Sequence, residues 1–175
     1  KGADIDVNCN GISLVHFASL KDNLDVIKFC LSIGSKIDSR SSYNQTPLHF
    51  AVLGNNYNSV DLLVTDGAVL EIVDNSGYTP LHYAVITGKS NLVKYLVENG
   101  GSITKQTYAI DLREIIFIKK NVSIEDIIRG FYIRNYYFYD KKFSNSFSLA
   151  CEYGNIDLVK YFLNYEKPLN TKFNE

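Results

Sequence analysis

Clusters of apolar residues recur along the chain at the spacing of an α-helix. Residues 26–31, 60–64 and 92–97 each place Val, Leu, Ile or Cys side chains one, three, four or five positions apart, which forms one apolar stripe on a helix. A glycine, suited to the left-handed backbone at a helix C-terminus, follows each stripe by three residues. These glycines are Gly34, Gly67 and Gly100. The pattern predicts three helices whose ends recur at one fixed spacing, which we call the period of the chain.

A short motif precedes each stripe at the same spacing. Residues 79–84 read TPLHYA, residues 46–51 read TPLHFA and residues 13–18 read SLVHFA. The threonine suits an N-cap, and the proline suits the first helical position because no N–H is needed there. The residues that carry this structural motif are His16, Thr46, Pro47, His49, Thr79, Pro80 and His82. Each repeat is therefore predicted to contain two helices.

This recurrence resembles the ankyrin-repeat family, in both period and motif. The resemblance implies an all-α solenoid of stacked helix-turn-helix units with β-turn fingers between them. It also implies that the motif histidine of one repeat bonds to the motif of the next. A solenoid presents an extended concave face, so the implied function is the binding of a partner protein.

We expect a single domain over residues 1–175, made of five units and a partial first unit. The expected boundaries are 1–7 for the end of a partial repeat, 8–40, 41–73 and 74–106 for regular repeats, 107–139 for a degenerate repeat and 140–172 for the last. The degenerate repeat is inferred because Ala84 and Ala150 are two periods apart. A non-ankyrin helical insert of the same length is the alternative. Both ends resemble parts of repeats, which predicts a fragment of a longer protein.

Composition narrows the class of protein. The net charge of −1 argues against a nucleic-acid partner, which usually requires a basic excess. No apolar run approaches the ~20 residues of a membrane span, so this segment is not expected to insert into a membrane. Three cysteines, Cys9, Cys30 and Cys151, do not form a disulfide framework. They favour a reducing, cytoplasmic location.

The sequence shows no constellation typical of catalysis or cofactor binding. His16, His49 and His82 occupy the same place in three repeats, so neighbours should lie roughly 10 Å apart, too far to share a zinc ion. Cys30 and Cys151 are expected to be buried and inert, because one lies on an apolar stripe and the other follows a motif alanine. We predict no enzyme activity, no metal and no cofactor.

The candidate contact residues follow from the family's variable positions on fingers and inner helices. They are Tyr43, Gln45, Leu53, Ser76, Tyr78, Ile86, Thr87, Lys141, Glu152 and Tyr153. The tyrosines stand out because tyrosine is enriched in binding hot spots. The alternative, weighed about equally, is that they only cover adjacent fingers.

An aromatic stretch at residues 131–143 is a second candidate patch. One side of a helix or loop cannot bury seven aromatic residues within thirteen positions, so some should be exposed. Its tyrosines are Tyr132, Tyr136, Tyr137 and Tyr139. The alternative is that these rings fill space around an irregular repeat.

The leading hypothesis is a non-catalytic module that binds a partner protein in its concave groove. A second places the module in a larger enzyme as a substrate-recruiting domain, since ankyrin arrays precede the membrane domain of some palmitoyltransferases. Such a chain would be tethered to a membrane enzyme. A third hypothesis is self-association through the aromatic stretch.

Overall fold

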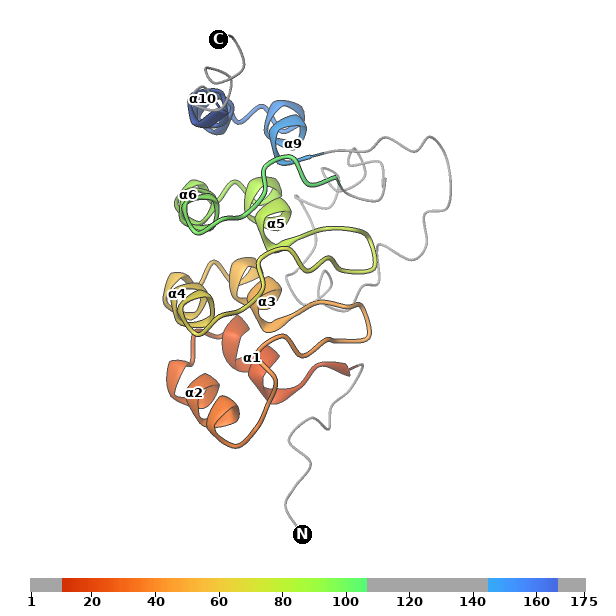
Figure 1. Cartoon of the computed structure of the whole chain (residues 1–175), viewed down its shortest axis with the longest axis vertical. Helices are drawn as coiled ribbons and strands as arrows, with labels where there is room; N and C mark the ends of the chain where they lie inside the picture. Colours follow the sequence, from red (N-terminus) through yellow and green to blue (C-terminus); the bar gives the residue numbers. More distant parts are fainter. Residues whose placement is uncertain (1–10, 107–144, 167–175) are drawn as a thin grey trace, which may run out of the picture.

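Eight helices form the part of the chain that this computed structural model describes, residues 11–106 and 145–166. Four inner helices, α1 (Leu14–Leu20), α3 (Pro47–Leu53), α5 (Pro80–Ile86) and α9 (Ser146–Glu152), have seven residues each. The outer helices are α2 (Leu24–Ser32), α4 (Tyr57–Thr65), α6 (Ser90–Glu98) and α10 (Ile156–Glu166). Each inner helix pairs with the outer helix that follows it, and the four pairs form one stack (Figure 1). The predicted all-α solenoid is confirmed.

The repeated local signals determine where the helices begin and end. At the start of α5, the Thr79 hydroxyl accepts from the His82 N–H at 3.3 Å, and Pro80 occupies the first position. After each of the first three outer helices comes a glycine with φ between 93° and 102°, a backbone conformation that other residues adopt at a cost. These are the predicted Gly34, Gly67 and Gly100. The sequence period therefore corresponds to a repeated backbone geometry.

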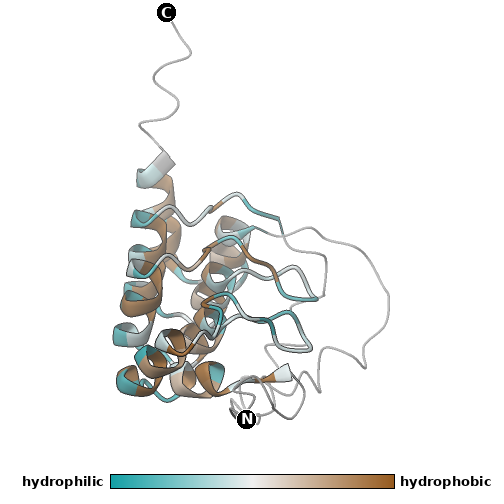
Figure 2. Cartoon of the chain, turned by 60° about the horizontal axis from the view of Figure 1, so that its bottom comes forward, coloured by the Kyte–Doolittle hydropathy of each residue, from teal (hydrophilic) through white to brown (hydrophobic). Residues whose placement is uncertain are grey.

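The core lies between neighbouring helix pairs. Along the inner column α1 packs on α3, α3 on α5 and α5 on α9, while α2 packs on α4 in the outer column. Ala51, Ala84 and Ala150 are fully buried at these contacts, where a small side chain allows two helices to approach closely. Figure 2 shows the apolar residues concentrated on the helices and the hydrophilic ones along the projecting loops. Burying each large apolar side chain contributes about 1.5–3 kcal/mol.

The predicted degenerate repeat at residues 107–139 lies outside the described residues and stays a prediction. Helix α9 packs directly on α5, in the same way that α5 packs on α3. The Ser146 N–H donates to the Ile103 carbonyl at 3.2 Å, and the Tyr165 hydroxyl donates to the Val97 carbonyl at 3.4 Å. The third described unit and the last one are therefore in direct contact. The described stack has four units.

Lys105 and Asn145 flank the residues that the structure does not describe between the third unit and the last. The Nε2–H of His82 donates to the Lys105 carbonyl at 2.9 Å, just as His16 donates to the Ser39 carbonyl at 3.1 Å, so Lys105 holds the position of Ser39. Asn145 then holds the position of Thr46 at the start of an inner helix. Residues 40–45 connect these positions in the earlier finger, whereas the much longer segment 106–144 connects them here. In the sequence, segment 106–144 is longer than segment 40–45 by one period. The predicted helices of residues 107–139 lie outside the described residues.

Candidate binding surface

Two described fingers project from the inner helices, and each ends in the same tight turn (Figure 1). The Ser41 N–H donates to the Gln45 carbonyl at 2.9 Å, and the Asp74 N–H donates to the Tyr78 carbonyl at 3.0 Å. In the second of these turns, Oδ1 of Asp74 also accepts from the Ser76 and Tyr78 N–H groups at 2.9 Å. In the first turn, Oγ of Ser41 accepts from the Tyr43 and Gln45 N–H groups, both at 3.2 Å. The two turns therefore have the same hydrogen-bonding pattern, although Ser41 accepts the bonds in one and Asp74 in the other.

Asparagine side chains fasten the two finger tips to each other. Nδ2 of Asn44 donates to Oδ1 of Asn75 at 2.9 Å, and Nδ2 of Asn75 donates to the Ser42 carbonyl at 3.2 Å. The Asn75 N–H also donates to the Tyr43 carbonyl at 3.0 Å. Asn44 has a φ of 61°. This left-handed conformation is expected, because Asn44 occupies the position in its finger that Gly77 occupies in the later one. The tips therefore form a fixed platform.

A buried polar network supports the platform from below. The Tyr83 hydroxyl on α5 donates to Oδ2 of Asp74 at 2.6 Å and accepts from Nε2 of Gln45 at 3.4 Å. Burial raises the pKa of the Asp74 carboxyl, and burial together with the Asp74 charge raises that of Tyr83 well above its usual value. The Tyr78 ring packs against Tyr83, with centroids 5.6 Å apart. Both fingers are thus tied to the third inner helix.

The motif histidines connect successive repeats, as the family resemblance implies. Nδ1 of His49 accepts from the Thr46 N–H at 3.1 Å, and its Nε2 lies 3.1 Å from the Tyr78 carbonyl of the next repeat. His16 makes the same link to the Gln45 carbonyl at 3.1 Å. Since a carbonyl only accepts and a backbone N–H only donates, the ring must be neutral with its proton on Nε2. Each imidazole therefore joins its own N-cap to the following finger.

Burial keeps these rings neutral. Desolvation lowers the pKa of both His49 and His82 to about 4, although a hydrogen bond to a backbone carbonyl acts in the opposite direction. In the described ranges, no group of three or more His, Cys, Asp or Glu residues is placed to hold a metal ion. The histidines act chemically as neutral hydrogen-bonding links.

Half of the predicted contact residues are buried in the structure. The side chains of Gln45, Leu53, Ser76, Tyr78 and Ile86 are all at least nine-tenths buried. Gln45 and Tyr78 lie under the finger platform, where Tyr78 is 1% exposed and packs against His82 and Tyr83. Leu53 and Ile86 end inner helices and belong to the apolar core. For Tyr78, the alternative interpretation as a structural ring fits the structure.

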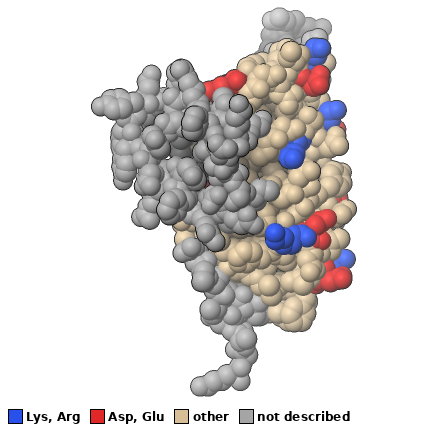
Figure 3. Space-filling model, turned by 180° about the vertical axis from the view of Figure 1, so that it is seen from behind, with Lys and Arg blue, Asp and Glu red and all other residues tan. Residues whose placement is uncertain are grey.

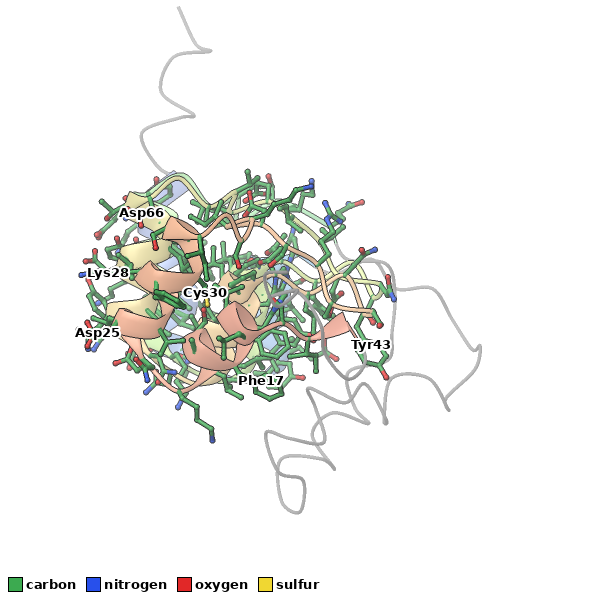
Figure 4. All side chains as sticks on the ribbon, turned by 90° about the horizontal axis from the view of Figure 1, so that it is seen from below. Phe17, Asp25, Lys28, Cys30, Tyr43 and Asp66 are labelled. Carbon is green, nitrogen blue, oxygen red and sulfur yellow. The ribbon has the colours of Figure 1, made fainter. Side chains whose placement is uncertain are left out.

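Four predicted contact residues remain accessible in the described part. Glu152 is exposed, and Tyr43, Thr87 and Tyr153 are half-buried. Figure 4 shows Tyr43 projecting at the finger end, far from the outer helices. The other candidates, Lys141, Tyr132, Tyr136, Tyr137 and Tyr139, lie outside the described residues.

Asn44 was missed as a contact candidate, although its left-handed position marked a turn. Like Asn75, it lies at a tip and keeps part of its surface accessible. We use the name finger face for the accessible residues of the described tips and inner-helix ends. They are Ser42, Tyr43, Asn44, Asn75, Thr87, Glu152 and Tyr153.

Charge is distributed unevenly around the stack. Across the two finger tips, 41–45 and 74–78, and the four inner helices, the acidic residues are the buried Asp74 and the exposed Glu152, and no Lys or Arg is present. The outer helices carry both signs, including Asp61 on α4 and Lys94 on α6. In the view of Figure 3, most of the visible charged side chains lie on the side of the outer helices. The finger face is therefore polar but nearly uncharged.

The cysteine prediction is correct for one residue and wrong for another. Cys30 is fully buried in the core, as expected from its apolar stripe. Cys151, which follows the buried Ala150, is exposed on α9. Cys9 lies outside the described residues.

Within residues 11–106 and 145–166, no helix is both long enough and apolar enough to cross a membrane.

Comparison with known proteins identifies the family. A family model described as ankyrin repeats (3 copies) matches residues 15–107, which is more than half of the chain. No curated protein matches it. Ankyrin repeats generally serve as protein–protein interaction modules and are typically non-catalytic. The matched residues contain the three helix pairs and two fingers whose links are described above, and the chain belongs to the ankyrin-repeat family.

Proposed function

We propose that this chain is a non-catalytic module that holds a partner protein against its finger face. The observation that carries the proposal is the rigid double platform made by Asn44 and Asn75, whose tips remain accessible. A surface fixed before binding loses little conformational entropy when a partner docks. Tyr43 and Tyr153 add large, partly accessible rings of a type enriched in binding hot spots.

The chemistry of the finger face restricts the partner. With Glu152 as its one charged side chain among the described residues, the face recognises its partner through hydrogen bonds and ring packing. Electrostatic steering therefore contributes little, and the association rate should change weakly with salt concentration. A partner segment rich in backbone or amide donors and acceptors suits the exposed asparagines.

A comparative capture experiment tests this proposal. The wild-type chain and the Tyr43→Ala/Tyr153→Ala variant are immobilised and exposed to the same cell extract, and captured proteins are quantified by mass spectrometry. We expect at least one protein held by the wild type to fall at least tenfold with the variant, because two hot-spot tyrosines together contribute more than about 2 kcal/mol. Tyr165→Ala is the matched control, since Tyr165 is an exposed tyrosine on the outer helix α10. Equal capture by all three chains would refute the finger face as the binding surface.

Two other predictions about function and location remain proposals. Recruitment of substrates to a larger enzyme, such as a membrane palmitoyltransferase, would use the same finger face. A reducing, cytoplasmic location is supported by three cysteines without a disulfide framework. Self-association through residues 131–143 depends on a stretch outside the described residues.

A further inference from the structure

The finger face carries a single accessible acidic side chain. Glu152 ends the inner helix α9 and is exposed, whereas Asp74, the other acid of the finger tips and inner helices, is buried. Those tips and helices contain no Lys or Arg, and no ion pair joins Glu152 to a described residue. The described finger face therefore has one negative charge that no cation balances.

This carboxylate occupies a position that is apolar in the earlier repeats. Glu152 ends α9 as Leu53 ends α3 and Ile86 ends α5. Leu53 and Ile86 are 4% and 7% exposed and belong to the apolar core. The repeat pattern therefore favours an aliphatic side chain here, and the glutamate departs from it.

Two tyrosine side chains lie near the carboxylate. Burial and the charge of Glu152 raise the pKa of Tyr153, the residue that follows it. Burial also raises the pKa of Tyr78, and the nearby Tyr153, Asp74 and Glu152 groups act in the same direction. Both phenols therefore stay protonated at neutral pH, so the site has one carboxylate beside two neutral hydroxyls.

The hydroxyl of Tyr78 has unused hydrogen-bonding capacity. Tyr78 is 1% exposed, and its hydroxyl oxygen makes no hydrogen bond within the described part of the chain. Its ring is held in place by Tyr83 and His82, whose centroids lie 5.6 and 6.0 Å away. A buried hydroxyl without a partner is unfavourable. A ligand that brings several hydrogen-bond donors to Glu152 could satisfy this oxygen as well.

We propose that Glu152, Tyr153 and Tyr78 form a subsite of the finger face that takes one arginine side chain of the partner protein. A guanidinium group can pair with the carboxylate through two parallel N–H bonds and stack on the Tyr153 ring. Its remaining N–H donors suit the Tyr78 hydroxyl. Lysine, a compact point charge, matches fewer of these groups. This inference rests on the proposed function and adds the chemistry of one partner residue.

A carboxylate that only keeps the last described unit in contact with water is the alternative, because the end of a solenoid needs a polar surface. In that case glutamine could replace Glu152 without any effect on binding. Charge complementarity makes a different prediction. Reversing the charge at this position should reverse the charge that the partner must carry.

Selection from a random peptide phage library against the immobilised full chain tests the subsite. Wild type, Glu152→Gln and Glu152→Lys are panned in parallel, and the bound phage are sequenced. With the wild type, we expect arginine at one peptide position to be enriched at least about fivefold over the input library. Glu152→Gln should lose this preference, and Glu152→Lys should select Asp or Glu instead. Glu98→Gln is the matched control, since Glu98 is an exposed acid on the outer helix α6, and should select the same peptides as the wild type.

A double-mutant cycle with one selected peptide measures the contact. Replacing the arginine of the peptide by alanine should weaken Kd about tenfold for the wild type but less than about twofold for Glu152→Gln. Tyr153→Ala and Tyr78→Phe should each weaken binding of the arginine peptide about threefold. Glu152→Gln should keep its Tm within about 2 °C of the wild type, because the side chain is exposed. Equal losses in the two arms of the cycle, or an unchanged Kd in Tyr78→Phe, would overturn the subsite.

Tyr43→Ala separates failure of this inference from failure of the proposed function. Peptides that depend on Tyr43 but have no preferred arginine would overturn the subsite and leave the finger face as the binding surface. Lysine enriched as strongly as arginine would overturn the guanidinium assignment. Peptides that bind Tyr43→Ala and Tyr153→Ala as well as the wild type, or the absence of any enriched peptide, would refute the finger face and the subsite together.

Discussion

Lowering the pH from 7 to 5 should destabilise the stack through its buried histidines. A histidine in the unfolded chain has a pKa of about 6.5, whereas desolvation lowers the pKa of His49 and of His82 to about 4. Between these two values the unfolded chain binds protons that the folded chain does not. The free energy of unfolding therefore decreases as the pH falls through this window.

The magnitude follows from the linkage relation. At pH 5, the difference between the two pKa values costs about 2 kcal/mol for each histidine, or about 4 kcal/mol for the pair. Asp74 acts in the opposite direction, because burial raises its pKa and so favours protonation of the folded state as the pH falls. The expected net loss is about 2–4 kcal/mol, a large part of the about 5–15 kcal/mol that stabilises a typical domain.

Urea denaturation followed by circular dichroism at pH 7, 6 and 5 measures this loss. The His49→Gln variant provides the control, because glutamine can donate and accept hydrogen bonds but does not titrate. It should be less stable at pH 7 by about 1–3 kcal/mol, through imperfect bonds to Thr46 and Tyr78, yet lose about half as much stability on acidification. A wild-type loss below about 1 kcal/mol, or an unchanged pH dependence in the variant, would refute the assignment of buried neutral histidines.

Other substitutions test individual contacts. Phe50→Ala should cost about 3–5 kcal/mol in urea denaturation, because Phe50 is fully buried. Phe17→Ala, at the same repeat position but 47% exposed, should cost under about 1 kcal/mol. Equal losses would contradict the difference in burial. Gly67→Ala should cost about 1–2 kcal/mol through backbone strain alone, because Gly67 has a φ of 93° and no atom lies within 4 Å of an added Cβ. An unchanged urea midpoint would exclude this strain. Asp22→Ala should lower the midpoint by the equivalent of about 1–2 kcal/mol, because Asp22 accepts from the Ser59 N–H, the Ser59 hydroxyl and Asn58. Hydrogen exchange that stays unchanged where α4 begins would argue against that link.

The sequence predicts the helices well, because their signals are local. The threonine, proline and glycine of each repeat act within one or two turns of the backbone, so their effect can be inferred without neighbours. Gly34 and Asn44 show this, since both adopt the left-handed conformation expected of their positions. The histidine links also followed, but from the family resemblance.

The sequence fails where the answer depends on contacts between distant segments. Whether Tyr78 is a contact residue or a structural ring depends on Tyr83, which lies on the helix that the finger covers. Likewise, a lengthened finger and an additional helix pair both add one period between Ala84 and Ala150. The structure adds that α9 packs on α5. Neither distinction is encoded in the spacing of apolar residues.

Residues outside the described part also bear on the design of these tests. In the sequence they lie between Lys105, whose carbonyl accepts from His82, and Asn145, the N-cap of α9. Variants of the described finger face, such as Tyr43→Ala/Tyr153→Ala, are therefore best compared in the full chain.

The arrangement of the stack is tested most directly by methyl NOE spectroscopy of the native full chain, labelled at Ala, Ile, Leu and Val. We predict NOEs between the methyl groups of α5 and α9, including those of Ala84, Leu149 and Ala150. NOEs that connect α9 to methyl groups of residues 107–139 in place of α5 would show an intervening repeat. That result would contradict the four-unit stack.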